Sequence, residues 1–340
     1  PLYDIAINKG LYPIVKVIEK SEKYNWEIEE SFFKLFQSSF AENYKSNEIY
    51  FTEQQNDLFT FFNESNQKTV SVIAPTSYGK SELIISTIKK RKRGNVCILV
   101  PSKALIAQTK RRLIRADIEN INKIITHPEM YLESDKDITA VLTQERLLRL
   151  LRKNRDLKFD TVFVDEAHNL LEKDERSMLL ASSISILEKR NSNIKFKFLT
   201  PFLIDSTNLI VRYTNYKPES FKITEYMKTE KFYIYDDRKE KKLKLYDQFI
   251  NKFYFTDESN FVDDIDLIIN KSSKKNIIYL NKPSDIEKFS SKFSSRLMKI
   301  ESSRIKKACK NISSLIDPDY SLINCIERGV IYHHGSVPEN

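Results

Sequence analysis

The tripeptide Gly-Lys-Ser occupies residues 79–81, after a short apolar run over residues 70–73 that ends at Pro75. The run is rich in β-branched side chains, and apolar residues recur at helical spacing over residues 83–88. A strand, a loop and a helix in this order are the context in which Gly-Lys-Ser binds phosphate. Backbone N–H groups of the loop would surround phosphate oxygens at a helix N-terminus, where the helix dipole also favours anions. The spacing therefore predicts a nucleotide-binding loop.

The side chains of this loop suit a nucleotide bound with a metal ion. Lys80 would reach the β- and γ-phosphates, and the Ser81 hydroxyl would ligate Mg²⁺. Ala74 stands where this pattern usually has glycine. The alternative interpretation is an accidental Gly-Lys-Ser in a chain rich in lysine and serine. The residues that we expect to contact the nucleotide are Ala74, Pro75, Thr76, Ser77, Tyr78, Gly79, Lys80 and Ser81.

A pair of acids, Asp165 and Glu166, follows a second apolar run over residues 161–164. In a phosphate-loop ATPase one carboxylate holds Mg²⁺ through water, and a neighbouring acid orients or deprotonates the attacking water. Asp165 suits the first role and Glu166 the second. Ligands of open α/β sheets bind beyond the carboxyl ends of the strands. The phosphate loop and the two acids both follow strands, so we expect them at the same edge of the sheet. The alternative is a charged N-cap for the following helix.

The elements that must position these residues are short apolar runs that alternate with helical patterns. This alternation predicts a doubly wound α/β domain with a parallel sheet over residues 50–213. Further strands are expected at residues 95–101, 138–143 and 195–201, and a short strand that runs into a proline turn within residues 123–130. Helices are expected at residues 102–113 and 144–153.

Three other segments flank this domain. Residues 1–49 are expected to form a helical extension, with an amphipathic pattern from Trp26 to Phe40. Residues 214–259 are rich in lysine and aromatic residues and are expected to form strands or a hairpin. Their side chains could stack on bases or could belong to ordinary half-buried strands. Residues 260–340 resume the α/β pattern as part of a second such domain, with strands expected at 276–280 and 329–335.

Composition narrows the class of protein. Hydrophobic residues make up 41% of the 340 residues and charged residues 30%, which is typical of a globular protein. No apolar run approaches the about 20 residues of a membrane helix, and no secretory signal is visible. Three cysteines without a Cys-x-x-Cys pair predict neither a disulfide framework nor a zinc site, so we expect a reducing, cytoplasmic setting.

The net charge of +9 is concentrated beside the nucleotide loop. Residues 80–115 hold eleven lysines and arginines against one acid, Glu82, a local charge of +10. Such a cluster indicates phosphate-bearing partners, and its alternative is a pair of solvated helix ends.

The order of five sequence motifs resembles superfamily-two DEAD/DEAH-box helicases. APTSYGKS, VPSKALIAQ, TQERL, VDEAH and LTP resemble motifs I, Ia, Ib, II and III, and FTEQQ resembles the Q motif. GVIYHHGSVP resembles motif IVa of the superkiller-like branch. This resemblance covers residues 51–340. It implies RecA-like domains, ATP and Mg²⁺ as cofactors, and single-stranded DNA or RNA as the partner, with a possible protein partner in a larger complex.

The resemblance also implies roles for individual residues. Gln55 would contact adenine, and His168 would join Lys80, Asp165 and Glu166 in the catalytic set by linking nucleotide state to an inter-domain cleft. Thr200 matches motif III, a coupling element, although LTP keeps only one of the hydroxyls of the usual Ser-Ala-Thr. The residues implied to touch the nucleic-acid backbone are Ser102, Lys103, Thr143 and Arg146.

The resulting functional hypothesis is an ATP-dependent helicase motor. Motifs V and VI, with the arginines that complete the ATP site, are absent from the sequence, which we therefore interpret as an N-terminal fragment with weak activity of its own. One alternative is a duplex translocase without unwinding, in a restriction or phage-defence complex. Another is a nucleotide-gated nucleic-acid-binding subunit with little turnover, against which the intact Glu166 argues.

Overall fold

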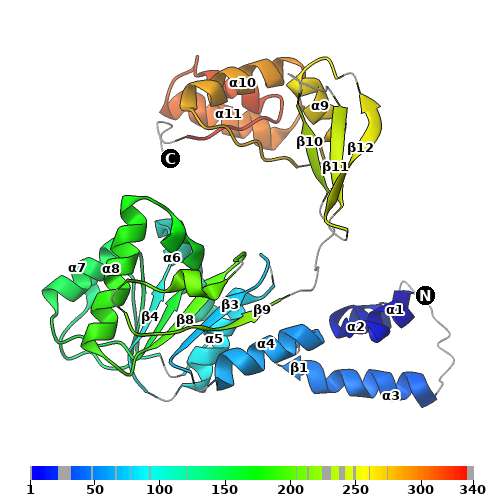
Figure 1. Ribbon diagram of the computed structural model, residues 1–340. Coiled ribbons are helices and arrows are strands. Elements are labelled where there is room, and N and C mark those ends of the chain that lie inside the picture. Colours follow the sequence, from blue (N-terminus) through cyan, green and yellow to red (C-terminus); the bar gives the residue numbers. More distant parts are fainter. Residues whose placement is uncertain are drawn as a thin grey trace. The chain divides into compact units, whose positions relative to one another are not determined.

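The computed structural model divides the chain into two compact units, residues 1–227 and residues 228–340 (Figure 1). Ser77 of the expected nucleotide loop and the start of the amphipathic pattern at Trp26 lie outside the described residues. The structure describes residues 2–21, 32–46, 49–65, 67–76, 78–91, 93–119, 121–203, 205–212, 214–223, 231–236, 242–247, 250–259, 261–273 and 275–334.

A parallel sheet of seven strands forms the centre of the first unit, in the order β5-β6-β4-β7-β8-β3-β9. Most of its strands are buried, as expected for a parallel sheet with both faces covered. The prediction of a doubly wound, RecA-like α/β domain is confirmed. The strands are β3 (Thr69–Ile73), β4 (Val96–Leu99), β5 (Lys123–Ile125), β6 (Ile138–Leu142), β7 (Thr161–Val164), β8 (Lys195–Thr200) and β9 (Glu219–Lys222).

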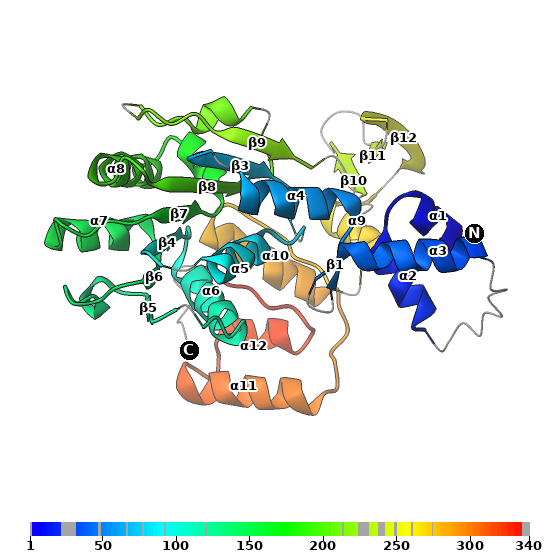
Figure 2. The same cartoon turned by 90° about the horizontal axis from the view of Figure 1, so that it is seen from below.

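Helices cover both faces of this sheet because the chain crosses it in both directions (Figure 2). The path from β3 through β4 to β5 runs one way, and the path from β6 through β7 to β8 returns, so right-handed crossovers place the helices on opposite faces. Alternate side chains of β7 show the two cores: Val162 and Val164 pack with α7 and α8, whereas Phe163 packs with α5 and α6. These helices are α5 (Lys80–Lys90), α6 (Lys103–Arg115), α7 (Gln144–Lys153) and α8 (Glu175–Arg190).

Helices precede the sheet, as expected. Tyr3, Ala6 and Val15 form a small core between the first two of them. Tyr12 donates a hydrogen bond of 3.1 Å from its hydroxyl to Glu53, the first residue of α4, and so ties this region to the helix that leads into β3. The elements are α1 (Leu2–Asn8), α2 (Tyr12–Glu19), α3 (Phe32–Ala41), η1 (Glu42–Tyr44), β1 (Lys45–Ser46), β2 (Ile49–Tyr50) and α4 (Glu53–Glu64).

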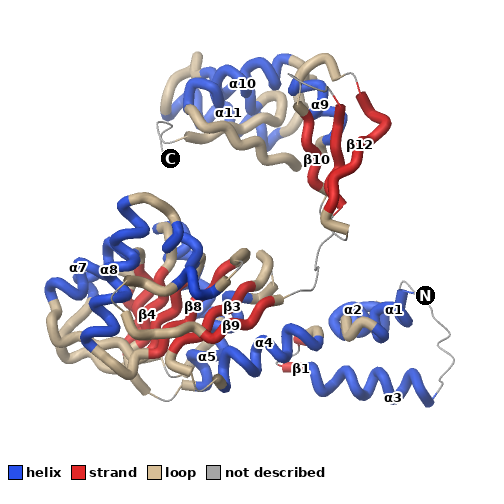
Figure 3. Tube along the Cα trace, viewed as in Figure 1, coloured by secondary structure: helices blue, strands red, loops and turns tan. Residues whose placement is uncertain are grey.

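The second unit combines a three-stranded antiparallel sheet with helices (Figure 3). The helices pack around Leu322, Cys325, Ile326 and Tyr332. Strands within residues 214–259 are thus confirmed, but β9 joins the first sheet, which therefore extends past residue 213. The elements are β10 (Phe232–Tyr235), β11 (Lys242–Asp247), β12 (Lys252–Ser259), α9 (Asp264–Lys271), α10 (Pro283–Ser295), α11 (Ser303–Leu315) and α12 (Ser321–Ile326).

Two expected strands of the second unit are not strands. Residues 276–280 and the described part of 329–335 have no paired neighbour among the described residues. Ile277 is 99% exposed, whereas Tyr332 packs against the helices. An apolar run satisfies its backbone as a strand only where neighbouring strands complete the ladder, so the pattern alone was insufficient. No helix in the described residues has the length and apolar character to cross a membrane.

Candidate nucleotide site

The phosphate loop begins where β3 ends and finishes at the first turn of α5. Gly79 is the N-cap of α5 with φ +96°, a left-handed conformation that glycine adopts without strain. A Cβ at Gly79 would meet no atom within 4 Å, so the backbone angle, and not space, favours glycine here. Among the first N–H groups of α5, that of Glu82 donates a 2.8 Å hydrogen bond to the Gly79 carbonyl, whereas those of Lys80 and Ser81 precede the first intrahelical bond, where an anion can accept their hydrogen bonds.

The buried side chain of Tyr78 anchors the loop to the core of the domain. The ring is fully buried in the core formed with α5 and α6, and the Tyr78 N–H donates a 3.3 Å hydrogen bond to the Pro75 carbonyl. The ring points into the protein, and the expected contact of Tyr78 with the nucleotide through its backbone N–H stays a prediction. Ala74 is also buried, and a hydrogen bond of 3.0 Å runs from its N–H to the Thr200 carbonyl.

Lys80 lies across the loop that precedes it. Its ammonium group donates hydrogen bonds of 2.7 Å to the Ala74 carbonyl and 3.2 Å to the Pro75 carbonyl. Burial lowers the pKa of Lys80, while the negative charges of Glu166 and Asp165 act in the opposite direction. The lysine of the loop and the two acids thus share one electrostatic environment.

Asp165 follows β7 directly, and its N–H donates a 2.9 Å hydrogen bond to the Leu99 carbonyl at the end of β4. Burial and then the charge of Glu166 raise the pKa of Asp165, against the effects of the Glu166 N–H, Lys80 and Arg112. Glu166 adopts a left-handed backbone conformation with φ 51° and ψ 48°, where the chain turns into the short helix η3 (Ala167–Leu171). For a residue with a Cβ this conformation costs about 1–3 kcal/mol and is typical of functional sites.

One open cleft of about 770 Å³ brings most of the expected catalytic residues together. The loop, the start of α5 and the acids after β7 line one part of it, and α6 lines another. The predicted residues that line it are Thr76, Gly79, Lys80, Ser81, Asp165 and Glu166.

Several polar residues of the cleft were not assigned to the site from the sequence. Gln108, Arg112 and Arg115 project from one face of α6, and Lys89 projects from α5. The arginines and Lys89 belong to the basic cluster over residues 80–115. Gln108, Arg112 and Arg115 are four and three residues apart, so they share one face of the helix. This spacing could have indicated which charges of the basic cluster face the loop.

Gln55 does not line this cleft. It occupies the third position of α4 in a capping box, where its side-chain oxygen accepts a 2.9 Å hydrogen bond from the Thr52 N–H. The Gln55 N–H donates in turn to the Thr52 hydroxyl at 3.2 Å. The structure gives Gln55 this local role, and contact with adenine stays a prediction.

His168 contacts both Glu166 and Phe202, and Thr200 contacts Phe202. The Nδ1 atom of His168 is 3.5 Å from a carboxylate oxygen of Glu166, and its ring centroid is 4.7 Å from that of Phe202. The Thr200 hydroxyl donates a 3.0 Å hydrogen bond to the Phe202 carbonyl. These contacts connect the end of β8 to the segment that carries Glu166.

The residues expected to touch nucleic acid have local structural roles. Ser102 caps α6 and accepts a hydrogen bond of 3.3 Å from the Leu105 N–H, and Lys103 is the exposed first residue of that helix. Thr143 is buried at the N-cap of α7. Arg146 donates a hydrogen bond of 2.7 Å to the Thr126 carbonyl. Nucleic-acid contact by these residues stays a prediction.

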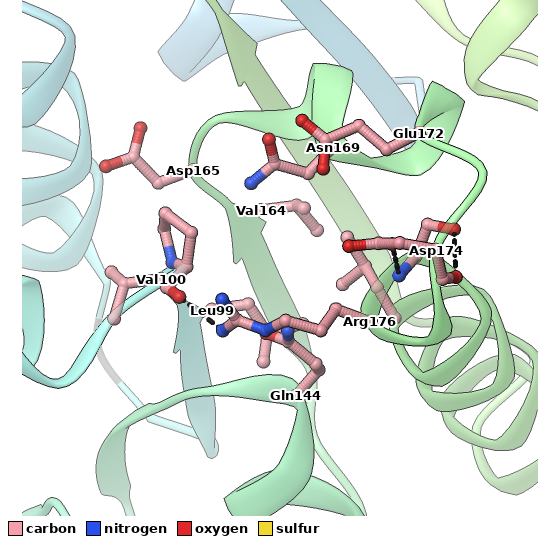
Figure 4. A pocket seen from close by; sticks show the side chains of 12 residues that line it. Leu99, Val100, Gln144, Val164, Asp165, Asn169, Glu172, Asp174 and Arg176 are labelled. Carbon is pink, nitrogen blue, oxygen red and sulfur yellow. Dashed lines mark hydrogen bonds between the residues drawn. The ribbon is translucent and has the colours of Figure 1, made fainter. Parts of the chain in front are cut away.

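Asp165 also lines a second cavity of about 40 Å³ (Figure 4). Arg176 spans it, donating to Glu145 at 3.0 Å and to the Pro101 carbonyl. The cavity has room for a water molecule but is far too small for a nucleotide. The hydrogen bonds of Arg176, a residue of α8, instead tie the turn after β4 to α7.

The donor set around the loop fits Mg²⁺. This ion usually keeps several waters and takes one or two protein ligands together with phosphate oxygens. The Ser81 hydroxyl and the Asp165 carboxylate line the same cleft and are ligands of this kind. Among the described residues, no group of three or more His, Cys, Asp or Glu side chains could hold a metal ion by itself.

Three solved structures are similar to parts of this chain. The Pyrococcus furiosus Hef helicase domain is 17% identical over 50% of this chain and 38% of its own, with a TM-score of 0.38. A hypothetical ATP-dependent RNA helicase from Sulfolobus tokodaii is 21% identical over 56% of this chain and 57% of its own, with a TM-score of 0.39. S. cerevisiae Dbp5 bound to Nup159, Gle1, IP6 and ADP is 13% identical over 56% of this chain and 52% of its own, with a TM-score of 0.40. The chain thus spans less than two thirds of each.

The comparison with curated proteins finds no match to this chain. A family model does match it: residues 52–200 fit the DEAD/DEAH box helicase family. The matched region runs from the cap of α4 to the last residue of β8 and contains the whole nucleotide cleft. Residues 52–200 are therefore similar to the DEAD/DEAH box helicase domain, in agreement with the superfamily-two helicases that the order of the motifs resembles.

Proposed function

We propose that this chain is the ATP-hydrolysing motor of a nucleic-acid helicase. The observation that carries the proposal is the single cleft in which Lys80 and Ser81 of the phosphate loop face Asp165 and Glu166. The family match over residues 52–200 supports this reading of the cleft.

The roles of the residues follow from their positions. The first N–H groups of α5 would bind the phosphates, and Lys80 would exchange its bonds to the Ala74 and Pro75 carbonyls for phosphate oxygens. Ser81 and Asp165 would hold Mg²⁺, and the bound ion would neutralise part of the negative charge of the phosphates. Glu166 would orient the attacking water and accept its proton.

The finer proposal is that hydrolysis drives unwinding in the cytoplasm, with single-stranded DNA or RNA as the track. The described cysteines, Cys97, Cys309 and Cys325, are all free thiols, as is usual in a reducing compartment. Activity of the chain by itself is proposed to be low, because the resemblance assigns further ATP-site arginines to motifs that the sequence does not contain. A strand-displacement assay beside a triplex-displacement assay separates unwinding from duplex translocation in a defence complex.

Measuring the affinity of the Lys80→Ala variant for Mg-ATP tests whether this loop binds the nucleotide. Loss of a partly buried charge that is paired with phosphate should weaken binding about thirtyfold or more. Lys90→Ala is the matched control, because Lys90 is an exposed lysine of the same helix that does not line the cleft. Equal ATP affinity of the two variants would contradict the assignment of the loop.

A further inference from the structure

Another pocket of the first unit lies at the end of the sheet opposite the nucleotide cleft, where the strands begin. Its volume is about 230 Å³, and its lining comes from the ends of α4 and α5 and from the starts of β4, β7 and β8. No residue lines both this pocket and the nucleotide cleft. The basic residues Lys90, Arg91, Lys195 and Lys197 line the pocket, whereas no acid does.

Lys197 is the buried cation of this basic pocket. Its side chain lies on β8 and is 7% exposed, and its ammonium group donates to the Phe62 carbonyl in the last turn of α4. No carboxylate in the described part of the chain forms an ion pair with Lys197. Burial lowers its pKa to about 8, and so does the positive charge of Lys195, which lies on the same face of β8. The surroundings therefore disfavour the charge of Lys197.

Comparison with Lys16 shows how this chain otherwise buries a lysine. Lys16, the other lysine that is buried among the described residues, lies 3.0 Å from Glu19 and 3.2 Å from Glu42. A buried charge normally has such a counter-ion, because burial of an unpaired ion is costly. The carbonyl that Lys197 contacts supplies only a partial negative charge. A bound anion would supply the counter-charge that Lys16 receives from its acids.

The helix ends at the pocket offset part of its positive charge. A carboxylate outside the pocket lies 3.9 Å from Lys90, and two others act on Arg91. The C-termini of α4 and α5 are each equivalent to about half a negative charge, so together they offset about one lysine. The pair formed by Lys195 and Lys197 thus keeps about one positive charge that the described residues do not balance.

The size and the lining of the pocket suit a small anion that carries a phosphate group. The volume has room for a phosphate ion with several waters and is small for a whole nucleotide. Ammonium and guanidinium groups beside hydroxyl and amide groups are the usual partners of phosphate oxygens. Two neighbouring lysines also favour a doubly charged anion over a single carboxylate. The hydroxyl and amide side chains of the lining are Asn63, Ser65, Gln67, Thr87 and Thr161.

We propose that the basic pocket binds a small phosphate-bearing anion, for which Lys197 provides the buried positive charge and Lys195 a second, exposed one. This proposal does not rest on the proposed function, because the pocket and the nucleotide cleft lie at opposite ends of the sheet.

Isothermal titration calorimetry with orthophosphate tests the proposal on the full chain. All proteins carry Lys80→Ala, so that the nucleotide loop does not contribute. Adding Lys197→Met should weaken phosphate binding about tenfold or more, and Lys195→Gln should weaken it about two- to fivefold because that lysine is exposed. Lys158→Gln, at an exposed lysine before β7 that does not line the pocket, should stay within about twofold of the parent.

A second measurement separates a ligand site from a lysine that only caps α4. Without phosphate, Lys197→Met should be more stable than the parent near neutral pH, because burial disfavours the charged lysine. Bound phosphate favours that charge, so the advantage should shrink in orthophosphate compared with chloride of the same ionic strength. The difference between Lys158→Gln and the parent should not change.

Three results would overturn the proposal. The first is a parent protein that binds no orthophosphate, and the second is equal phosphate affinity of Lys197→Met and Lys158→Gln. The third is a stability advantage of Lys197→Met that is the same in phosphate and in chloride. None of these results bears on the nucleotide cleft, since Lys80→Ala removes its contribution from every protein compared.

Discussion

Ala74 and Thr200 join the phosphate loop to the end of β8, through a hydrogen bond of 3.0 Å from the Ala74 N–H to the Thr200 carbonyl. The Thr200 hydroxyl continues the connection to the Phe202 carbonyl, and the Phe202 ring packs against His168. His168 in turn lies 3.5 Å from Glu166. A change at the phosphates therefore has a contiguous path to the segment beyond β8.

Thr200→Val should interrupt this path without emptying the core, because valine keeps the shape of threonine and removes the hydroxyl. We expect a loss of stability of about 1 kcal/mol, unchanged Mg-ATP affinity and weaker stimulation of ATP hydrolysis by nucleic acid. Thr139→Val is the control, since the buried Thr139 hydroxyl has no hydrogen-bond partner among the described residues. Equal nucleic-acid stimulation in both variants would remove Thr200 from the coupling path.

The left-handed backbone of Glu166 predicts a conflict between stability and activity. Glu166→Gly should raise the free energy of unfolding by about 1 kcal/mol, because relief of backbone strain exceeds the entropic cost of glycine. The same variant should lose ATP hydrolysis. Chemical denaturation monitored by circular dichroism measures the first effect. Asp165→Gly, at a position without positive φ, should instead destabilise the protein, and a stabilised Asp165 variant would speak against the argument.

Arg112 should assist binding of the phosphates from α6. It lines the cleft, and its charge opposes the rise in the pKa of Asp165. Because the side chain is exposed and screened by solvent, Arg112→Ala should weaken Mg-ATP binding only about two- to fivefold, and less so at high salt. Arg111→Ala, an exposed neighbour that does not line the cleft, should bind as wild type. Isothermal titration calorimetry would compare them, and identical affinities would exclude Arg112 from the site.

Lys197 on β8 predicts a dependence of stability on pH. Burial lowers its pKa to about 8, although its ammonium group donates to the Phe62 carbonyl and lies 4.1 Å from the Phe62 ring centre. Since the unfolded chain retains the usual value of 10.5, it binds more protons than the folded chain between about pH 8 and pH 10.5. The contribution of Lys197 to stability should therefore rise with pH through this window, by up to about 3 kcal/mol.

Denaturation curves of Lys197→Met against wild type isolate this effect from other titrations. The variant should be more stable near neutral pH, and its advantage should shrink as pH rises above about 8. Lys195→Met, at an exposed position of the same strand, should show no such trend. A constant difference between Lys197→Met and wild type across the window would show that Lys197 keeps its proton.

The sequence was most informative where local pattern and tertiary environment agree. The runs that became β4, β6, β7 and β8 are buried on both faces, so their apolar character alone identified them. The loop at Gly79 and the acids at Asp165 are likewise specified by short-range context, a positive φ and a strand end.

The sequence did not predict the direction in which individual side chains face or whether an apolar run finds a strand to pair with. Tyr78 is buried although its neighbours form the loop, and Arg112 faces the cleft while Arg111 does not. The apolar residues at 276–280 have a strand pattern without paired strands. These outcomes are set by contacts distant in the sequence, which local periodicity does not contain.

Glu166→Gln tests the central claim that the cleft is an ATPase site. Glutamine keeps the size of glutamate and its αL position but accepts no proton from water, so Mg-ATP binding should stay near wild type while hydrolysis falls about 10²–10⁴-fold. Glu82→Gln, at another acid of the same cleft, should leave hydrolysis unchanged. Single-turnover hydrolysis of ATP by these variants beside wild type, in the presence of single-stranded nucleic acid, decides the matter. The account predicts bound, unhydrolysed ATP in Glu166→Gln, and hydrolysis at the wild-type rate in that variant would contradict it.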